Sequence, residues 1–151
     1  MGESNLPLVH VINGPNLNML GKREPEIYGS MSLDDINQGL GKLAGELDLA
    51  LSFFQSNHEG AILDHIHAVF EQEPAGIIIN PGAFTHTSVA LRDGLLLLSC
   101  PIIEVHLSNI HKREPFRHKS MIADIAYGQL TGFGYFGYHM ALLSIHNYLN
   151  N

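Results

Sequence analysis

The sequence LVHVI at Leu8–Ile12, followed by NGPNLNMLGKREPEIYG at Asn13–Gly29, carries the strongest structural signal in the chain. The first run is short and apolar, which is typical of a buried strand. The second run is far longer than the roughly 2–6 residues that usually join a strand to a helix, and it gathers amides, cations, carboxylates and one tyrosine. A solvated surface loop would have a similar composition. Because Gly and Pro recur along it, we interpret Asn13–Gly29 as a functional loop with a defined path.

Strand-like and helix-like patterns alternate beyond this loop. Ser32, with Asp35 three residues later, predicts the capped start of a helix. Apolar runs predict further strands at 49–54, 76–79, 102–106 and, more weakly, 125–130. Helical spacing predicts helices after residue 32, around 62–70, from 85–88 to 98 and from about 135, with a short helical turn at 113–118.

This alternation predicts an α/β fold. Strands that are apolar throughout are typical of a parallel sheet with helices on both faces. With five strands and right-handed crossovers, we expect the flavodoxin-like three-layer arrangement, with strand order 2-1-3-4-5. The 151 residues fit a single domain, 1–151, large enough to bury about 70% of its unfolded surface.

Composition excludes several classes of protein. Hydrophobic residues make up 45% and charged residues 15%, which indicates a globular chain. No apolar run approaches the ~20 residues of a membrane span, and we see no secretory signal. The single cysteine, Cys100, lies beside an apolar run, so we expect no internal disulfide, a buried inert thiol and a cytoplasmic protein.

The charge distribution points to a small anionic ligand. The net charge is −7, with only 8 Lys and Arg residues, which argues against binding nucleic acid. The cations gather in two places, one at Lys22 and Arg23, the other at Lys112, Arg113, Arg117 and Lys119.

Polar clusters follow three of the predicted strands, at Asn13–Tyr28, Asn80–His86 and His106–Ser108. In the order 2-1-3-4-5 the carboxyl ends of strands one, three and four are neighbours, and ligands of such sheets bind at that edge. We therefore expect the three clusters to form one site.

Two pairs in these clusters suit proton transfer. Tyr28 lies near Arg23, and a cation about 4.5 Å away would lower a phenol pKa from its ordinary value near 10; a tyrosine that only packs its ring is the alternative. Glu104 and His106, two apart on a strand, share a face. The carboxylate would then hold the imidazole as a general acid, or the two would form a structural ion pair.

Three further patterns need separate interpretations. The turn Asn80–Ser88 precedes a helix and offers backbone amides to an anion or hydroxyls, or it is a simple capped turn. GxGxxG at Gly132–Gly137 lies near the carboxyl terminus, so we interpret it as a close-packed helix entry. His65 and His67 do not share a helix face, and no metal-binding motif is present. We therefore expect no metal site.

Four segments, in order and spanning nearly the whole chain, carry a family resemblance. They are the loop Asn13–Gly29, QSNHEG at Gln55–Gly60, INPGAFTHTSVALRD at Ile79–Asp93, and IEVHLSNIHKREPFR at Ile103–Arg117. Together they resemble type II 3-dehydroquinate dehydratase. The resemblance implies a lyase that removes water from 3-dehydroquinate to give 3-dehydroshikimate through an enolate, in the shikimate route to aromatic compounds or in quinate breakdown. It implies no cofactor, metal or Schiff base.

The resemblance also implies a role for each matching residue. Tyr28 corresponds to the general base and Arg23 to the arginine that activates it. Asn16 corresponds to the holder of a water that stabilises the enolate, and His106, backed by Glu104, to the acid. Residues matching those that grip the ring hydroxyls and carboxylate are Asn80, His86, Leu107, Ser108 and Arg117, with Arg113 as a second arginine near the base.

The resemblance extends to assembly and motion. The family forms homo-oligomers, dodecamers built from trimers, in which Asp93 matches a residue that reaches a neighbouring site. Its lid corresponds to about Met19–Tyr28. From the residues alone, two alternatives stay open: a non-catalytic flavodoxin-like module for a phosphorylated ligand or flavin, and a metal-dependent hydrolase.

Overall fold

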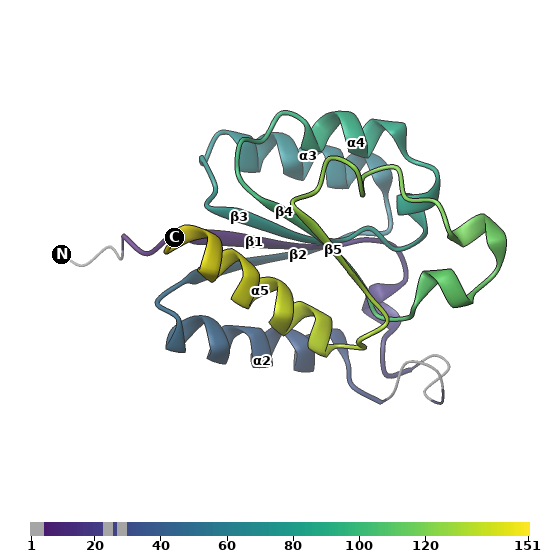
Figure 1. The fold of residues 1–151 in the computed structure, drawn as a ribbon, viewed down its shortest axis with the longest axis horizontal. Helices are drawn as coiled ribbons and strands as arrows, with labels where there is room; N and C mark the ends of the chain where they lie inside the picture. The colour runs from purple at the N-terminus through teal and green to yellow at the C-terminus, as the bar shows by residue number, and fades with distance from the viewer. Residues whose placement is uncertain (1–4, 23–25, 27–29) are drawn as a thin grey trace.

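The computed structural model describes residues 5–22, 26 and 30–151. Its five strands form one parallel sheet in the order β2-β1-β3-β4-β5, which confirms the expected topology. Helices α3 and α4 cover one face, and α2 and α5 cover the other (Figure 1). The strands are β1 (Leu8–Asn13), β2 (Ala50–Gln55), β3 (Gly76–Asn80), β4 (Ile102–His106) and β5 (Gly128–Thr131). The helices are α2 (Leu33–Glu46), α3 (Glu59–Phe70), α4 (Val89–Leu95) and α5 (Phe136–Leu149).

Alternation along the central strands divides the core into two layers. Val11, Ile78 and Val105 pack toward α2 and α5, whereas Ile12 and Ile79 pack toward α3 and α4. All of these side chains are fully buried. Both faces of the central strands are therefore apolar, which is why their sequences lack polar alternation.

The predicted start of α2 is confirmed. The Ser32 side chain accepts a hydrogen bond from the backbone N–H of Asp35, and the Asp35 carboxylate accepts one from the N–H of Ser32. This capping box satisfies two backbone donors that the first helical turn leaves free.

Three sequence-based expectations need correction. The second strand is not buried, because β2 lies at the sheet edge and Phe53 is 39% exposed. The third helix begins at Val89 rather than at 85–88, since Gly82–His86 forms a separate 3₁₀ helix and Ser88 caps α4. The fifth strand starts at Gly128, because the preceding backbone turns back onto Ile122.

The glycine-rich segment before α5 is a close-packed helix entry, as expected. Gly132 has a φ of 97°, and a Cβ there would lie 2.9 Å from Cβ of Asn109. The N–H groups of Gly132 and Gly134 donate to the carbonyls of His106 and Leu107. These two hydrogen bonds attach the segment to His106, the last residue of β4, and to Leu107, which follows it.

The structure bears on two predictions that were made from the composition. Cys100 is only partly buried, so the expectation of a fully buried thiol was wrong, although burial still raises the pKa of that thiol. Among the described residues, no helix combines the length and the apolar character that crossing a membrane requires.

Candidate active site

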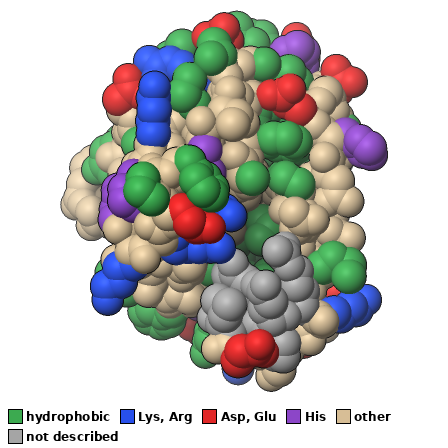
Figure 2. Space-filling model, turned by 90° about the vertical axis from the view of Figure 1, so that its right-hand side faces the viewer, with side chains coloured by type: hydrophobic (Ala, Val, Ile, Leu, Met, Phe, Trp, Pro, Cys, Tyr) green, Lys and Arg blue, Asp and Glu red, His purple; other side chains and the backbone are tan. Residues whose placement is uncertain are grey.

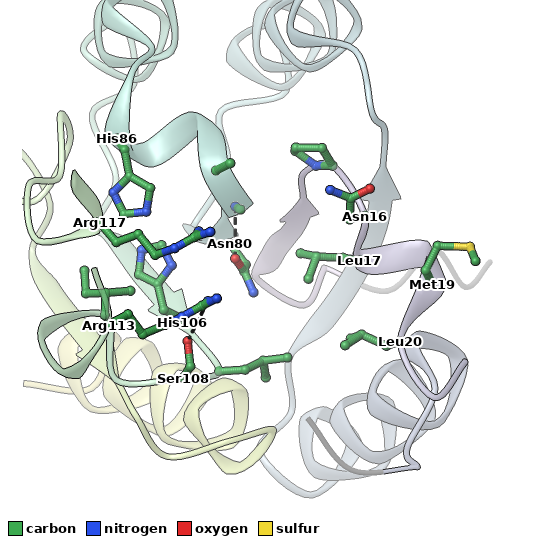
Figure 3. Close-up of a pocket in the computed structure, with 15 residues that line it drawn as sticks. Asn16, Leu17, Met19, Leu20, Asn80, His86, His106, Ser108, Arg113 and Arg117 are labelled. Atoms are coloured by element: carbon green, nitrogen blue, oxygen red, sulfur yellow. Dashed lines mark hydrogen bonds between the residues drawn. The ribbon is translucent and has the colours of Figure 1, made fainter. Parts of the chain in front are cut away.

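A cavity of about 200 Å³ lies beyond the carboxyl ends of β1, β3 and β4 (Figure 3). The structure brings eight of the predicted site residues together in its lining: Asn16, Asn80, His86, His106, Leu107, Ser108, Arg113 and Arg117. Sequence reasoning missed its apolar wall, which includes Leu17, Leu20 and Ile110. These side chains give no polar signal in the sequence, and they suit one face of a compact ring.

Of the other four predicted residues, two fall outside the described residues, and two are described but do not line the cavity. Arg23 and Tyr28 lie outside the described residues, as does half of the expected lid. Glu104 is fully buried behind His106 rather than in the cavity. Asp93 is exposed on α4 and does not contribute to the lining of this chain's cavity.

Two turns form the floor of the cavity, and their backbones touch. A Cβ on Gly14 would lie 2.4 Å from the carbonyl oxygen of Pro81, and a Cβ on Gly82 would lie 3.0 Å from that of Pro15. The N–H of Gly14 donates to the carbonyl of Asn80 at 2.8 Å. Glycine is required at both positions because no side chain fits between the turns.

Asn16 is held in place by the segment after β2. Its backbone has a φ of 71°, in the left-handed region where asparagine is tolerated better than most residues. Its N–H donates to the side-chain oxygen of Asn57 at 2.9 Å, and Gln55 donates to the carbonyl of Gly14 at 3.0 Å. These contacts leave the Asn16 side chain at the rim of the cavity.

The predicted pairing of Glu104 with His106 is confirmed. Nε2 of His106 lies 2.5 Å from Oε2 of Glu104, and both side chains are buried. Because an ionised carboxylate only accepts, Nε2 carries a hydrogen. The other ring nitrogen, Nδ1, is therefore left for the cavity that the ring lines.

Two hydroxyl groups that sequence reasoning missed complete the surroundings of Glu104. Thr85 donates to Oε2 at 2.6 Å, and Ser120 lies 2.9 Å from both carboxylate oxygens. Burial opposes ionisation of this carboxyl, but the hydrogen bonds from His106, Thr85 and Ser120 outweigh it, so the pKa of Glu104 lies below its ordinary value. Glu104 is thus a carboxylate that can stabilise a cationic His106.

His86 offers a second imidazole with a defined orientation. Its Nδ1 lies 2.8 Å from the carbonyl oxygen of Lys119 and must carry the hydrogen, because a carbonyl only accepts. The ring stacks near that of His106, with centroids 6.3 Å apart. Nε2 of His86 is then an acceptor suited to a ligand hydroxyl.

The cationic side of the cavity is formed by Arg113 and Arg117. Nε of Arg117 donates to Glu114 at 2.9 Å, and Nη1 of Arg113 lies 3.5 Å from the Ser108 hydroxyl. Lys and Arg side chains gather beside histidines on the face of the molecule seen in Figure 2. Two guanidinium groups that line one pocket are a suitable partner for a carboxylate.

No group of three or more His, Cys, Asp or Glu side chains is placed to bind a metal ion within the part of the chain that the structure describes. Outside the cavity, His65 stacks on Phe54 with ring centroids 4.0 Å apart.

Comparisons with known proteins show the family to which the chain belongs. The family described as dehydroquinase class II matches residues 7–146. The 3-dehydroquinate dehydratase of Halothermothrix orenii is 56% identical over 139 residues, which covers 92% of this chain and 93% of that protein. The enzyme of the same name from Francisella philomiragia is 55% identical over 143 residues, covering 94% and 96%.

The fold has a close counterpart among solved structures. The crystal structure of type II dehydroquinase from Butyrivibrio crossotus has a TM-score of 0.90 to this chain at 42% sequence identity. The match covers 93% of this chain and 97% of that one.

Proposed function

The chain belongs to the class II dehydroquinase family, and from this premise we propose that it is a 3-dehydroquinate dehydratase. This hydro-lyase removes water from 3-dehydroquinate to give 3-dehydroshikimate. The observation that carries the proposal is the buried Glu104–His106 pair, which presents one imidazole nitrogen to a cavity with two arginines.

His106 supplies the acid. The reaction abstracts a proton next to the ketone, forms an enolate, and expels a hydroxyl that needs a proton to leave as water. Nδ1 of His106 delivers that proton, and the Glu104 carboxylate stabilises the imidazolium beforehand. Such a group contributes roughly 10²–10⁴-fold to the rate.

Tyr28 supplies the base, with Arg23 lowering its pKa. Both residues lie outside the described part of the chain, so this assignment rests on the sequence match to the family. An ordinary tyrosine pKa near 10 is too high for a base at neutral pH, and a neighbouring guanidinium favours the phenolate. Asn16, at the rim of the cavity, holds the water that stabilises the enolate oxygen.

The remaining polar residues bind the substrate. Arg117 pairs with the carboxylate, because its Nη atoms stay available while Nε is bound to Glu114. Asn80, His86 and Ser108, with the backbone at Leu107, bind the ring hydroxyls, and Arg113 adds positive charge to the cavity. No cofactor or metal takes part in this scheme.

The assembly and location belong to the same proposal. The chain folds as one domain, acts in the cytoplasm and forms a dodecamer of trimers, in which Asp93 reaches a neighbouring site. Asp93 is exposed, whereas the adjacent Arg92 is bound to Asp124 and to the carbonyl of Met121 within the chain. Exposed Leu96 and Leu97 provide apolar surface near it. Light scattering should give a mass many times 16.6 kDa; a monomer would refute the assembly.

A spectrophotometric assay tests the activity. The conjugated product should appear when the purified protein meets 3-dehydroquinate, and no product at any protein concentration would refute the function. His106→Gln should lower kcat by at least about 100-fold. His67→Gln replaces an exposed histidine on α3 and should leave kcat unchanged.

A further inference from the structure

A fully buried tyrosine lies directly behind the candidate active site. The hydroxyl of Tyr138, on the first turn of α5, donates to Oδ1 of Asn13 at 2.5 Å and accepts from Nδ2 of Asn80 at 3.0 Å. Tyr138 has no exposed surface and does not line the cavity. Among the described residues its hydroxyl bonds to these two asparagines, and Asn80 is the one of the two that lines the cavity.

The topology of the sheet brings the three side chains together. Asn13 and Asn80 are the last residues of β1 and β3, and they are register partners. Strand alternation turns both toward α5, on the same face as Val11 and Ile78. On the opposite face of the sheet, Glu104 and His106 form the acid pair, so two buried networks approach one cavity from two layers.

The backbone N–H of Gly82 determines which atom donates in each hydrogen bond of this network. The N–H of Gly82 can only donate, so the atom 3.1 Å away is Oδ1 of Asn80. The other amide atom, Nδ2, then donates to the Tyr138 oxygen, and the hydroxyl hydrogen goes to Asn13. One hydrogen of Nδ2 has no partner among the described residues, and Asn80 lines the cavity.

We propose that Tyr138 is a positioning residue for substrate specificity: the Gly82 N–H sets which amide atom of Asn80 is the oxygen, and the Tyr138 hydroxyl holds Nδ2 in place so that its second hydrogen faces the substrate. Asn80 is then a donor to a substrate oxygen. This inference rests on the proposed function and on the geometry of the three side chains. Burial raises the pKa of the Tyr138 phenol far above its ordinary value, so the hydroxyl keeps its hydrogen at any working pH.

Tyr138→Phe is the direct test, because it keeps the ring and removes only the hydroxyl. Without that acceptor the Asn80 amide keeps only its contact with the Gly82 N–H and is held less firmly, so we expect KM for 3-dehydroquinate to rise by about three- to tenfold. We expect kcat to change by less than about twofold, because the acid pair lies on the other face of the sheet. Tyr148→Phe, on the exposed part of α5, is the matched control and should leave both constants unchanged.

A double-mutant cycle separates positioning from a general loss of stability. Tyr138→Phe should raise KM no further when Asn80 is already Ala, because the orientation it controls is gone. Equal effects of Tyr138→Phe in both backgrounds, or no effect on KM in either, would overturn the inference. If Tyr138→Phe does not fold, Asn13→Ala removes the acceptor from the far side, and an unchanged KM in that variant would also overturn it. Wild-type protein that lacks activity would refute the proposed function instead.

Discussion

At the scale of single residues, Glu104 has the strongest constraints in the site. It is fully buried, and its carboxylate accepts hydrogen bonds from an imidazole and two hydroxyls. Glu104→Gln keeps the shape but removes the charge that stabilises a cationic His106. We expect kcat to fall by about 100-fold or more with KM nearly unchanged, because Glu104 does not reach the cavity.

Steady-state kinetics over a range of pH checks this expectation. The exposed residue Glu71, on the far side of the molecule at the end of α3, gives the control Glu71→Gln, with no expected change. A Glu104→Gln enzyme with wild-type kcat at every pH would show that His106 acts without its carboxylate.

A second prediction at this scale concerns Glu114, whose replacement should have two opposite effects on substrate binding. Its carboxylate accepts from Nε of Arg117 at 2.9 Å and lies 3.8 Å from Nε of Arg113. Removing a negative charge beside an anion site should strengthen substrate binding, whereas releasing Arg117 should weaken it. Glu114 is half-exposed and its charge is screened. We therefore expect the release of Arg117 to affect substrate binding more than the loss of the negative charge does.

The two effects separate in a pair of variants. Glu114→Gln keeps an acceptor for Arg117 and should leave KM equal or lower. Glu114→Ala removes the acceptor and should raise KM by about two- to fivefold, since the arginine must then be ordered during binding. A lower KM in the alanine variant would mean that charge alone matters there.

Sequence reasoning found the residues that face the cavity more readily than those behind them. Glu104 and His106 were predictable because a spacing of two on a strand fixes their common face. Thr85 and Ser120 were not, since their contacts with Glu104 join positions 19 and 16 residues away through turns of irregular backbone. Tyr138 lies still further from its partners, 125 residues from Asn13.

At the scale of elements, the contact between the turns after β1 and β3 controls the shape of the cavity. A Cβ on Gly14 would lie 2.4 Å from a backbone oxygen, and backbone cannot move aside as a side chain can. We expect Gly14→Ala to destabilise the protein by about 1–3 kcal/mol or more and to lower activity even in the fraction that folds.

Gly41→Ala is the matched control, because nothing lies within 4 Å of the Cβ it adds in the middle of α2. Alanine there should stabilise the helix by about 0.5–1 kcal/mol. Urea unfolding measures both variants. Equal stability of Gly14→Ala and Gly41→Ala would show that the turns after β1 and β3 can move apart at little cost in free energy.

Element types were predictable, but the ends and edges of elements were less so. Continuous apolar strands and the Ser32 cap are local signals, and the structure confirms both. The exposure of Phe53 was not local, because it depends on β2 having only one neighbour. The early end of α4 at Leu95 also lacked a signal, since the leucines continue beyond it.

At the scale of the whole molecule, strand order determines which distant segments meet. The order 2-1-3-4-5 makes neighbours of the ends of β1, β3 and β4, and the structure places one cavity there. The position of the cavity could be predicted from the sequence, because right-handed crossovers leave few possible strand orders. Subunit assembly could not be predicted in this way, because an exposed leucine on a helix does not indicate which other surface covers it.

Stability of the whole molecule should depend on two neighbouring histidines, the buried His10 and the partly buried His65. His10, on β1, is 1% exposed, and neither of its ring nitrogens has a hydrogen-bond partner in the described structure. Its ring lies edge-on to that of His65, with centroids 6.0 Å apart. Burial lowers the pKa of both histidines; for His10 the proximity of His65 lowers it further, and the side chain of Gln72 opposes this shift without reversing it.

The sign of the pH dependence follows from these shifts. The unfolded chain protonates both histidines near their ordinary pKa of about 6.5, while the folded protein keeps them neutral to lower pH. Between those values the unfolded state binds more protons, so the free energy of unfolding should fall as pH drops below about 6.5. The low pKa of Glu104 acts in the same direction, but only below its ordinary carboxyl range, near pH 4.5.

The window from pH 7.5 to 5.5 therefore lies above the carboxyl range, and the difference between the wild type and a His10 variant isolates His10 from the other histidines. Urea midpoints for the wild type should decrease across it, and His10→Leu, which replaces an unpaired imidazole with an apolar side chain, should flatten that slope. His146→Leu removes a partly exposed histidine on α5 and serves as the control, with the wild-type slope retained. A His10→Leu slope equal to the wild-type slope would mean that the burial of His10 contributes nothing to the pH dependence of stability.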